Sequence, residues 1–470
     1  MNYVALPRCV YCRIYGDNAY LFNRQNWASA FLRDVAAFRN FFSRHPVDVQ
    51  REIHRIAEEC ELADGAVEAD FHEVFDPLVS DGYFVTGDRV VRADDSPFPC
   101  ATVSSLNSSP ENSIADASTD SADEHYEDAT ASLCRYFEAH PTPFELCIDL
   151  TQSCTERCVH CYVPEFKPVA LDVELAKKVI GEFAAAGGLK VKLTGGECMT
   201  HSAFKEILLL ATASDMVVSV LSNLTLCDDA MAEHIASCGV AIVQTSLYGA
   251  RPETHEEITR RKGSFLETVS GIDRLLAHGV PVQINCPVMK ANLGDVDAIR
   301  AFARARNIKV SFDPSIMCRA DHDAGNQSYC LDERELEGYL RRTIDSDEKV
   351  EESVDRQMLV DKRVCEIGIS KVCLAASGIY YPCNGCYGYH LGDCRKMSIT
   401  EVWQGEAMRH LRGLTFRDLD RCRTCENLLY CKACPSRNFN ATGSLAEPDL
   451  AACRLAALRR KVCCEGGCVC

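Results

Sequence analysis

Three cysteines lie close together in one short run, Cys154, Cys158 and Cys161, at C-x3-C-x2-C spacing. Three thiolates so spaced can hold three irons of a [4Fe-4S] cube and leave the fourth iron open to a small molecule or substrate. Clusters that only transfer electrons normally have four cysteine ligands. A zinc knuckle is the alternative, but it needs a fourth Cys or His at short spacing, and His160 is badly placed to share the metal. The spacing therefore favours an iron-sulfur site with a reactive position.

A strand-like apolar run at residues 144–151 precedes these cysteines, and five further runs alternate with helical stretches. The later runs cover residues 189–193, 217–221, 241–247, 280–288 and 308–312. Strands that alternate with helices in this way predict parallel βα units, as a partial barrel or a doubly wound sheet. Both architectures bind ligands at the carboxyl ends of their strands, which is where the three cysteines fall.

Polar and glycine motifs follow three of the later strands. The turn after the second strand contains Gly195, Gly196 and Glu197; Ser222 and Asn223 follow the third strand, and Ser246 lies in the fourth. The glycines permit close backbone approach, and the Glu197 carboxylate can accept from an ammonium group. Each motif alone is more often a turn or a helix cap, so the signal lies in their combination.

In this order, at successive strand ends, the cysteine loop and these motifs resemble the radical S-adenosylmethionine (radical SAM) superfamily over residues 140–320. The resemblance implies an α/β core at residues 140–345, folded as a partial (β/α)6 TIM-like barrel. It also implies that an open iron chelates the amino and carboxylate groups of SAM. One electron then cleaves SAM to a 5′-deoxyadenosyl radical that abstracts hydrogen.

The same resemblance implies roles for individual residues. Cys154, Cys158 and Cys161 would ligate the catalytic cluster, and Tyr162 would lie beside the adenine. The motif Gly195, Gly196 and Glu197 would meet the methionine amine. The positions that face the ribose and the carboxylate of SAM would be Ser222, Asn223 and Ser246. Arg260 or Arg261 is a further candidate for contact with the SAM carboxylate.

A second set of cysteines follows in the carboxyl-terminal third. Cys365 precedes a G-x4-C motif that ends at Cys383, a C-x2-C-x5-C-x2-C run follows, and Cys453 comes last. The run comprises Cys422, Cys425, Cys431 and Cys434. One structural zinc is the alternative, but the cysteines on both flanks favour more than one metal group.

This array resembles the SPASM domain, at residues 360–456 here, which carries two auxiliary [4Fe-4S] clusters. By position, Cys365, Cys383 and Cys434 would hold the nearer cluster, and the other four thiols the farther one: Cys422, Cys425, Cys431 and Cys453. The last gap is one residue shorter than usual, which weakens the assignment of Cys434. The fourth ligand of the nearer cluster is open among three cysteines: Cys373, Cys386 and Cys394. The fourth iron could also have no protein ligand.

Asn384 follows the cysteine that ends the G-x4-C motif. Sulfatase-maturing enzymes, which share this architecture, have an aspartate there, and an asparagine cannot take a proton at neutral pH. Sulfatase maturation is therefore disfavoured.

The first 86 residues predict a separate module. Two strands flank a Gly-Asp-Asn turn in residues 11–22, helical patterns cover 28–38, 46–62 and 69–78, and a strand-like end covers 83–85. This pattern resembles the winged-helix recognition element of enzymes that modify ribosomally made peptides (RiPPs), in which a leader peptide adds a strand. A DNA-binding winged helix and a packing domain are the alternatives.

Composition separates two further segments and excludes some partners. Residues 87–131 are rich in Ser, Asp and Glu and predict a disordered acidic linker, whereas 457–470 predict a loose Cys-rich tail. With 50 basic against 68 acidic residues, no nucleic-acid partner is expected. No apolar run reaches roughly 20 residues, so no membrane partner is expected. The sequence has no recognisable signal peptide, which predicts a cytoplasmic location. The 29 cysteines are accordingly expected to be reduced.

These observations together predict a radical SAM/SPASM maturase that binds a ribosomal precursor peptide and installs a crosslink, with a Cys thioether as the leading product. A reducing protein such as flavodoxin or ferredoxin would supply electrons. Carbon-carbon crosslinking, or oxidation of a peptide or cofactor precursor, is the alternative within the same chemistry. A non-enzymatic alternative is an iron-sulfur electron carrier or a peptide-binding scaffold.

Overall fold

The computed structural model describes residues 2–24, 26–87, 129–163, 165–344, 356–419 and 421–465. It divides into two compact units, Met1–Pro141 and Thr142–Cys470. Most of the expected linker, residues 88–128, lies outside the described residues. Among the described helices, none combines the length and the apolar character needed to cross a membrane.

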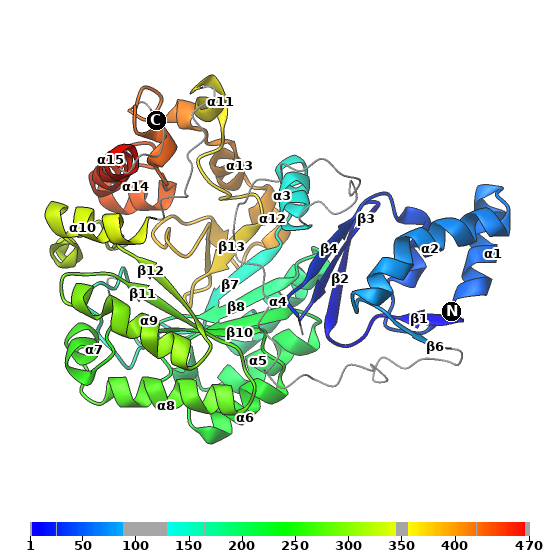
Figure 1. Ribbon diagram of the computed structural model, residues 1–470, viewed down its shortest axis with the longest axis horizontal. Coiled ribbons are helices and arrows are strands. Elements are labelled where there is room, and N and C mark those ends of the chain that lie inside the picture. The colour runs from blue at the N-terminus through cyan, green and yellow to red at the C-terminus, as the bar shows by residue number, and fades with distance from the viewer. Residues whose placement is uncertain are drawn as a thin grey trace. The chain divides into compact units, whose positions relative to one another are not determined.

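The first unit contains two three-stranded antiparallel sheets (Figure 1). One sheet has the order β5-β1-β6, and the other has the order β2-β3-β4. The strands are β1(Tyr3–Ala5), β2(Val10–Tyr15), β3(Asn18–Asn23), β4(Ser29–Leu32), β5(Val47–Asp48) and β6(Val85–Gly87). The predicted hairpin in residues 11–22 is present as β2 and β3, joined at Gly16, whose φ of +58° suits a tight turn.

Two long helices pack on an aromatic core in this unit. The helix α1(Val49–Cys60) begins where the Asp48 side chain accepts from the backbone N of Arg51, and α2(Asp64–Ser80) follows it. Phe71 and Phe75 of α2 stack with ring centroids 4.6 Å apart, and Phe41 contacts both rings. A third helix, α3(Ala129–Ala139), packs Phe137 edge-on against Tyr15 of β2, so the unit extends beyond residue 86.

The helix predicted over residues 28–38 is wrong. Residues 29–32 form β4, which pairs antiparallel with β3, and a 3₁₀ helix η1(Ala36–Phe41) follows. Trp27 and Asp34 on either side of β4 have φ values of +61° and +55°, which a right-handed helix cannot contain. Pairing with β3 therefore decides the conformation of a segment whose local pattern suggested a helix.

The second unit is built on a nine-stranded sheet with the order β12-β11-β10-β9-β8-β7-β13-β14-β15. The first six strands along this order are parallel to their neighbours and coincide with the six predicted strands. They are β7(Glu145–Asp149), β8(Lys190–Thr194), β9(Val217–Leu221), β10(Ile242–Ser246), β11(Val282–Pro287) and β12(Lys309–Asp313). The predicted partial α/β barrel of the radical SAM type is therefore confirmed.

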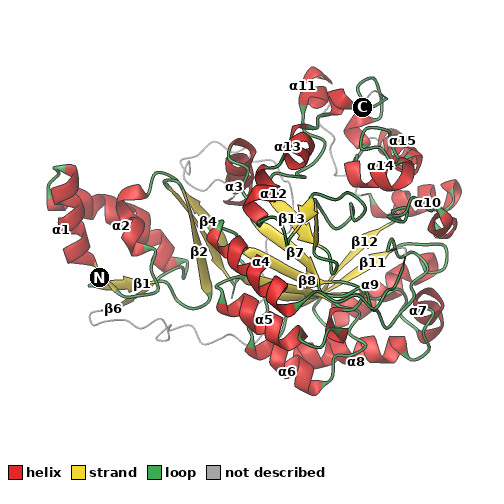
Figure 2. Cartoon of the chain, turned by 180° about the vertical axis from the view of Figure 1, so that it is seen from behind, coloured by secondary structure: helices red, strands yellow, loops and turns green. Residues whose placement is uncertain are grey.

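Helices connect these strands, and α5, α6 and α8 lie along one side of the sheet (Figures 1 and 2). The connecting helices are α4(Val173–Ala185), α5(Phe204–Ala213), α6(Asp229–Ser237), α7(Pro252–Thr259), α8(Ser264–Ala277) and α9(Val296–Ala305). Aspartate side chains cap α4 and α6, from Asp172 and Asp228. The main core forms where their apolar faces pack on the strands, and it includes Ile148, Leu193 and Phe183.

The carboxyl-terminal region continues the same sheet. The strand β13(Lys371–Leu374) pairs parallel with β7, and β14(Ile379–Tyr381) and β15(Gly392–Asp393) extend it antiparallel. The helices here are α10(Glu333–Thr343), α11(Arg356–Asp361), α12(Ile399–Gln404), α13(Glu406–Gly413), α14(Pro435–Thr442) and α15(Leu450–Glu465). The two segments expected as separate domains, residues 140–345 and 360–456, therefore lie in one compact unit.

The last helix crosses the boundary expected for a loose tail at residue 457. Residues 457–465 continue α15, and Lys461 Nζ contacts Glu337 Oε2 of α10 at 2.8 Å. Val462 and Leu458 pack in a small core with Leu340 of α10. Contact with α10 therefore orders residues that the Gly- and Cys-rich ending alone did not suggest as helix, while 466–470 lie outside the described residues.

Candidate active site

The cysteine loop leaves the carboxyl end of β7 and is held by backbone hydrogen bonds on two sides. Arg157 N donates to Thr259 O at 2.9 Å, and Val159 N donates to Ile258 O at 3.0 Å, at the end of α7. Toward the sheet, Leu150 N donates to Thr194 O at 2.8 Å. The three thiols of this loop, on Cys154, Cys158 and Cys161, are all half-buried. The loop is therefore fixed by the sheet and by α7 together.

The protonated form of each thiol is favoured in this environment. Burial raises the pKa of Cys154 to about 12, and it raises the pKa values of Cys158 and Cys161 above their usual 9. Metal coordination removes a thiol proton and neutralises the charge that burial penalises. Three half-buried thiols on one loop, where the nearest carboxylate Glu156 also has its pKa raised to about 7 by burial, fit an iron-sulfur cluster.

The Gly-Gly turn after β8 packs directly on the cysteine loop. Gly196 N donates to Thr151 O at 2.7 Å, and Glu197 N donates to Ser153 O at 2.8 Å. A Cβ added at Gly195 would lie 2.4 Å from Thr151 O, and one at Gly196 would lie 2.4 Å from Ser153 O. Gly195 also has a φ of +143°. Only glycine fits both positions, so the turn is required for the contact between the two loops.

Glu197 joins the β8 and β9 loops from a fully buried position, with 0% of its surface exposed. Its carboxylate accepts from Ser222 Oγ at 2.8 Å, from Asn223 N at 2.7 Å and from Met199 N at 3.0 Å. Burial raises its pKa, while these hydrogen bonds oppose the rise. Both carboxylate oxygens already have protein donors, so the side chain first serves to position Ser222 and Asn223; its contact with the methionine amine stays a prediction.

Asn223 braces the cysteine loop from β9. Its Nδ2 donates to Thr155 Oγ1 at 2.9 Å and lies 3.8 Å from Cys154 Sγ, while Thr155 Oγ1 is 2.8 Å from Thr225 Oγ1. The predicted residues of β8 and β9 thus meet the cysteine loop in one place. We expect a ligand of the open iron to contact them.

Ser246 at the end of β10 lies beside Tyr248, which sequence reasoning did not single out. The Tyr248 ring packs edge-on against His160 of the cysteine loop, with centroids 4.9 Å apart, and Tyr248 N donates to His255 Nδ1 at 3.2 Å. Its burial next to Cys158 was not readable from a Tyr-Gly pair in the sequence.

The two arginine candidates for the SAM carboxylate differ. Arg260 donates to the Tyr329 hydroxyl at 3.1 Å on an exposed side. Arg261 pairs with Glu267 at 2.7 Å, and its buried Nη1 has no hydrogen-bond partner among the described residues. A buried guanidinium nitrogen without a partner suits an anionic ligand group, so Arg261 is the better candidate.

The structure places Tyr162 near a buried carboxyl and two thiols. The phenol interacts with Asp149, Cys147 and Cys373, and burial raises its pKa well above 10. Its backbone oxygen accepts from Ala320 N at 2.9 Å. This environment, at the junction of β7 and β13, was not foreseen from the sequence.

Asp149, the last residue of β7, forms a short hydrogen bond with Tyr381, the last residue of β14. Tyr381 Oη donates to Asp149 Oδ2 at 2.5 Å, and the side chains are 1% and 7% exposed. Burial raises the pKa of Asp149 to about 7. Asn384 lies beside this pair, where its Nδ2 donates to Cys147 Sγ at 2.9 Å. A carboxyl group that titrates near neutral pH is thus present even though position 384 is an asparagine.

The carboxyl-terminal cysteines separate into two groups by their mutual electrostatic interactions. The thiols of Cys365, Cys383 and Cys434 lie close together: besides burial, charges on Cys434 and Cys383 would raise the pKa of Cys365, and a charge on Cys434 would raise that of Cys383. In the second group, burial and then charges on neighbouring cysteines raise the pKa values of Cys422, Cys431 and Cys453, and Cys425 is among those neighbours in each case. The structure therefore brings together the sets expected at the nearer and farther clusters, with Cys434 in the nearer one.

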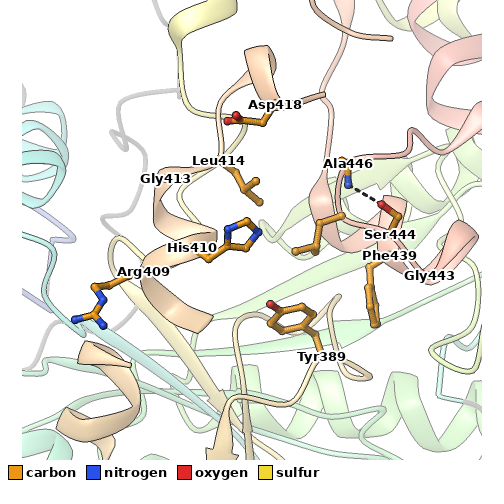
Figure 3. Close-up of a pocket in the computed structure, with 11 residues that line it drawn as sticks. Tyr389, Arg409, His410, Gly413, Leu414, Asp418, Phe439, Gly443, Ser444 and Ala446 are labelled. Atoms are coloured by element: carbon orange, nitrogen blue, oxygen red, sulfur yellow. Dashed lines mark hydrogen bonds between the residues drawn. The ribbon is translucent and has the colours of Figure 1, made fainter. Parts of the chain in front are cut away.

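A pocket of about 550 Å³ lies farther along this region, between α13 and the loop after α14 (Figure 3). Tyr389, His410 and Phe439 point into it, and Arg409 and Asp418 lie toward its edges. None of the cysteines or motif residues predicted for the clusters or for SAM lines it. The pocket is therefore separate from the candidate active site.

Comparison with known proteins gives a consistent result. Residues 148–303 match the family model of the radical SAM superfamily, and residues 365–435 match that of SPASM, an iron-sulfur cluster-binding domain. The AdoMet-dependent heme synthase of Methanosarcina barkeri is 27% identical over 330 residues, which cover 64% of this chain and 93% of that protein. The subtilosin biosynthesis protein AlbA of Bacillus subtilis is 32% identical over 160 residues, or 33% of this chain and 36% of AlbA.

Among solved structures, SuiB of Streptococcus suis, bound to its precursor peptide SuiA, has a TM-score of 0.59 at 14% identity. The likeness covers 96% of this chain and 99% of the SuiB chain, and it shows the fold.

The fold and the site define a radical SAM enzyme, which requires a [4Fe-4S] cluster and SAM. Residues 365–435 add a SPASM domain, which binds auxiliary iron-sulfur clusters. The non-enzymatic alternatives, an electron carrier or a scaffold, are therefore wrong.

Proposed function

We propose that this enzyme modifies a ribosomally made precursor peptide and that its product is a crosslink, with a Cys thioether as the specific bond. The observation that carries the proposal is the combination, in one chain, of a radical SAM/SPASM unit with an additional unit at Met1–Pro141. A fold like that of SuiB over 96% of the chain supports it, because SuiB was crystallised with a precursor peptide. The similarity to AlbA, a bacteriocin biosynthesis protein, supports it independently.

The first unit is the proposed binding site for the leader part of the peptide. Its β5-β1-β6 sheet ends on both sides in strands of two or three residues, in the part of the chain that the structure describes. A bound peptide strand could extend such a sheet through backbone hydrogen bonds, with side-chain pockets fixing its register. The acidic surplus of the chain favours a leader that carries basic residues.

The bound cluster and SAM supply a hydrogen-abstracting radical. Gly196 and Glu197 hold the cysteine loop in position through their backbone hydrogen bonds. Another residue of the chain can accept a proton. Formation of a thioether releases the proton of the substrate thiol, and Asp149 Oδ2 can hold a proton near neutral pH while Tyr381 donates to it. Asn384 cannot do so, which again disfavours sulfatase maturation.

The test is a reaction of the reduced full-length enzyme with SAM and short Cys-containing peptides encoded beside its gene. We expect formation of 5′-deoxyadenosine and a product that has lost two hydrogens. After iodoacetamide treatment, a thioether product should carry one alkyl group fewer than the starting peptide. The same peptide without its leader segment should react far more slowly. A product that keeps all its alkylatable cysteines would instead indicate a carbon-carbon crosslink.

Oxidation of a small cofactor precursor is the second candidate function. The observation in its favour is the 27% identity to a heme synthase over 93% of that protein's length. That alignment leaves about a third of this chain unmatched, whereas the fold likeness to SuiB does not. Turnover of a porphyrin-type precursor, followed by absorption spectroscopy, with no product from any peptide would favour this candidate. A flavodoxin or ferredoxin is the proposed electron donor in either case.

A further inference from the structure

The nearer auxiliary group lacks an assigned fourth ligand, and the structure separates the three competing cysteines. Three ligands are predicted for this group, and their thiols interact with one another: Cys365, Cys383 and Cys434. Cys386, Cys373 and Cys394 are all fully buried, so burial alone does not choose between them. The groups that surround each thiol distinguish the three cysteines.

Cys386 lies among the three thiols of the group. Its thiol is fully buried and lies close enough to Cys383, Cys434 and Cys365 to interact electrostatically with all three. A tight turn fixes its place, since Cys386 N donates to Cys383 O at 2.8 Å.

Gly385, between the two cysteines of this turn, packs against both sides of the site. A Cβ there would lie 2.7 Å from Met317 Cε and 3.3 Å from Ser436 Cβ. Ser436 Oγ in turn lies 2.9 Å from Cys383 Sγ. The turn that carries Cys383 and Cys386 is therefore packed closely against Met317 and Ser436.

Cys373 has different neighbours. It lies on β13 directly opposite Cys147 of β7, and its Sγ donates to Asn384 Oδ1 at 3.5 Å. The strongest interactions of its thiol are with Cys147, and Cys383 of the nearer group follows. Its thiol also interacts with Asp149, and its side chain packs in a small buried cluster with Tyr381.

Cys394 is farther away still. The charged groups with the largest influence on its thiol are Arg395, Asp393, Lys178 and Glu182. Lys178 Nζ donates to its backbone oxygen at 2.6 Å, next to α4. Cys394 therefore packs against the outer helix.

We propose that Cys386 is the fourth protein ligand of the nearer auxiliary cluster, together with Cys365, Cys383 and Cys434. Four thiolates from the protein fit a [4Fe-4S] cube, and all four irons then carry protein sulfur. No iron of this cluster remains for a substrate thiol, so the cluster serves electron transfer and does not bind the substrate. This inference depends on the SPASM domain and not on the identity of the substrate.

The test uses the full-length chain with Cys154→Ala, Cys158→Ala and Cys161→Ala, so that the open catalytic cluster cannot contribute to the signal. Reconstituted anaerobically without substrate, this background should give reduced EPR and Mössbauer spectra that do not change when 2-mercaptoethanol is added. With Cys386→Ala added, one cluster should become thiol-responsive or lose an iron, and its reduction potential should shift. Cys394→Ala is the matched control and should behave as the background does.

Spectra of the background that respond to 2-mercaptoethanol would overturn the proposal, as would a Cys386→Ala protein with unchanged spectra. A response in the Cys394→Ala protein would overturn it too. Because the background measurement needs no change at Cys386, the proposal stays falsifiable if that variant does not fold. None of these measurements involves a peptide, so their failure is distinct from failure of the proposed function.

Discussion

The cysteines predicted to hold the catalytic cluster and those predicted to hold the auxiliary clusters would bind the same kind of metal group, but the two sets are assembled in opposite ways. Cys154, Cys158 and Cys161 come from one loop of eight residues, so their spacing in the sequence is also their spacing in space. The nearer auxiliary group takes thiols from positions as far apart as Cys365 and Cys434. A local site can be read from a motif, whereas a site assembled from distant segments depends on the fold of everything between them.

The contacts that hold the two sets of cysteines in place also differ. Backbone hydrogen bonds to the Gly196–Glu197 turn and to the end of α7 hold the catalytic loop, and the Thr155 side chain adds contacts with Asn223 and Thr225. The auxiliary groups depend on side-chain contacts such as that between Ser436 and Cys383. We therefore expect a side chain added where backbones pack closely to damage the catalytic loop most. In the auxiliary region, we expect loss of a single thiol to affect only the cluster that it would hold.

The largest effect is expected from Cys158→Ala. The catalytic cube loses one of only three protein ligands, so the iron content should fall by about four per chain and 5′-deoxyadenosine formation should reach background. Iron analysis and a dithionite-driven SAM cleavage assay measure both quantities. Substantial SAM cleavage in this variant would mean that the radical chemistry resides elsewhere.

Cys453→Ala tests the other side of the comparison. The farther auxiliary cluster should be lost or altered in EPR spectra, because Cys453 interacts with Cys422 and Cys431 of that group. SAM cleavage without substrate should stay within about tenfold of the wild-type rate, since among the described residues no backbone hydrogen bond joins the catalytic loop to this group. A loss of SAM cleavage as complete as that of Cys158→Ala would show that the two regions are not independent.

Gly196→Ala should disturb the catalytic loop without removing any ligand. The new Cβ would lie 2.4 Å from Ser153 O, a backbone atom that cannot easily move, so we expect a loss of roughly 1–3 kcal/mol of unfolding free energy together with weaker SAM binding. Gly181→Ala is the matched control. It lies inside α4 with no atom within 4 Å of the new Cβ and should gain about 0.5–1 kcal/mol. Anaerobic urea unfolding compares the two, and equal stabilities would contradict the proposed close packing.

Asp149→Asn should change how stability depends on pH. Burial raises the pKa of Asp149 from 3.8 to about 7, so the folded protein holds a proton that the unfolded chain releases. The contribution is fully present below pH 4 and is lost as the pH rises to about 7, at about 1.4 kcal/mol per pH unit. Urea midpoints between pH 5.5 and 8 should therefore fall with pH more steeply in the wild type up to about pH 7. Parallel curves for the two proteins would contradict this assignment.

The sequence predicted the sheet well because its signals were local. Each of the six parallel strands is a short apolar run followed by a turn, and β7 to β12 match these runs. Residues 28–38 failed because pairing with β3 outweighed their helical pattern. The number and order of the strands thus follow from local patterns, whereas the conformation of an amphipathic segment depends on its partner.

The site was predictable to the extent that its residues sit in motifs. The Gly-Gly-Glu turn and the two residues after β9 meet the cysteine loop as a motif reading suggests. The pair of Asp149 and Tyr381 could not be found, because 232 residues separate them. Tyr381 occupies one of the four unspecified positions of the G-x4-C motif, so the motif itself does not require a tyrosine there. An aspartate at the exact end of an apolar strand was the one available signal, and its meaning depends on the tyrosine that faces it.

The pairing of β7 with β13 has a mechanical consequence. β7 leads into the catalytic loop, β13 and β14 lead to Cys383, and four residue pairs join β7 to β13, from Lys371 with Glu145 to Leu374 with Ile148. The two redox regions cannot drift apart unless this ladder of backbone hydrogen bonds breaks. The tunnelling distance between them is thereby set by a rigid framework, and any opening that admits a substrate must come from segments outside it.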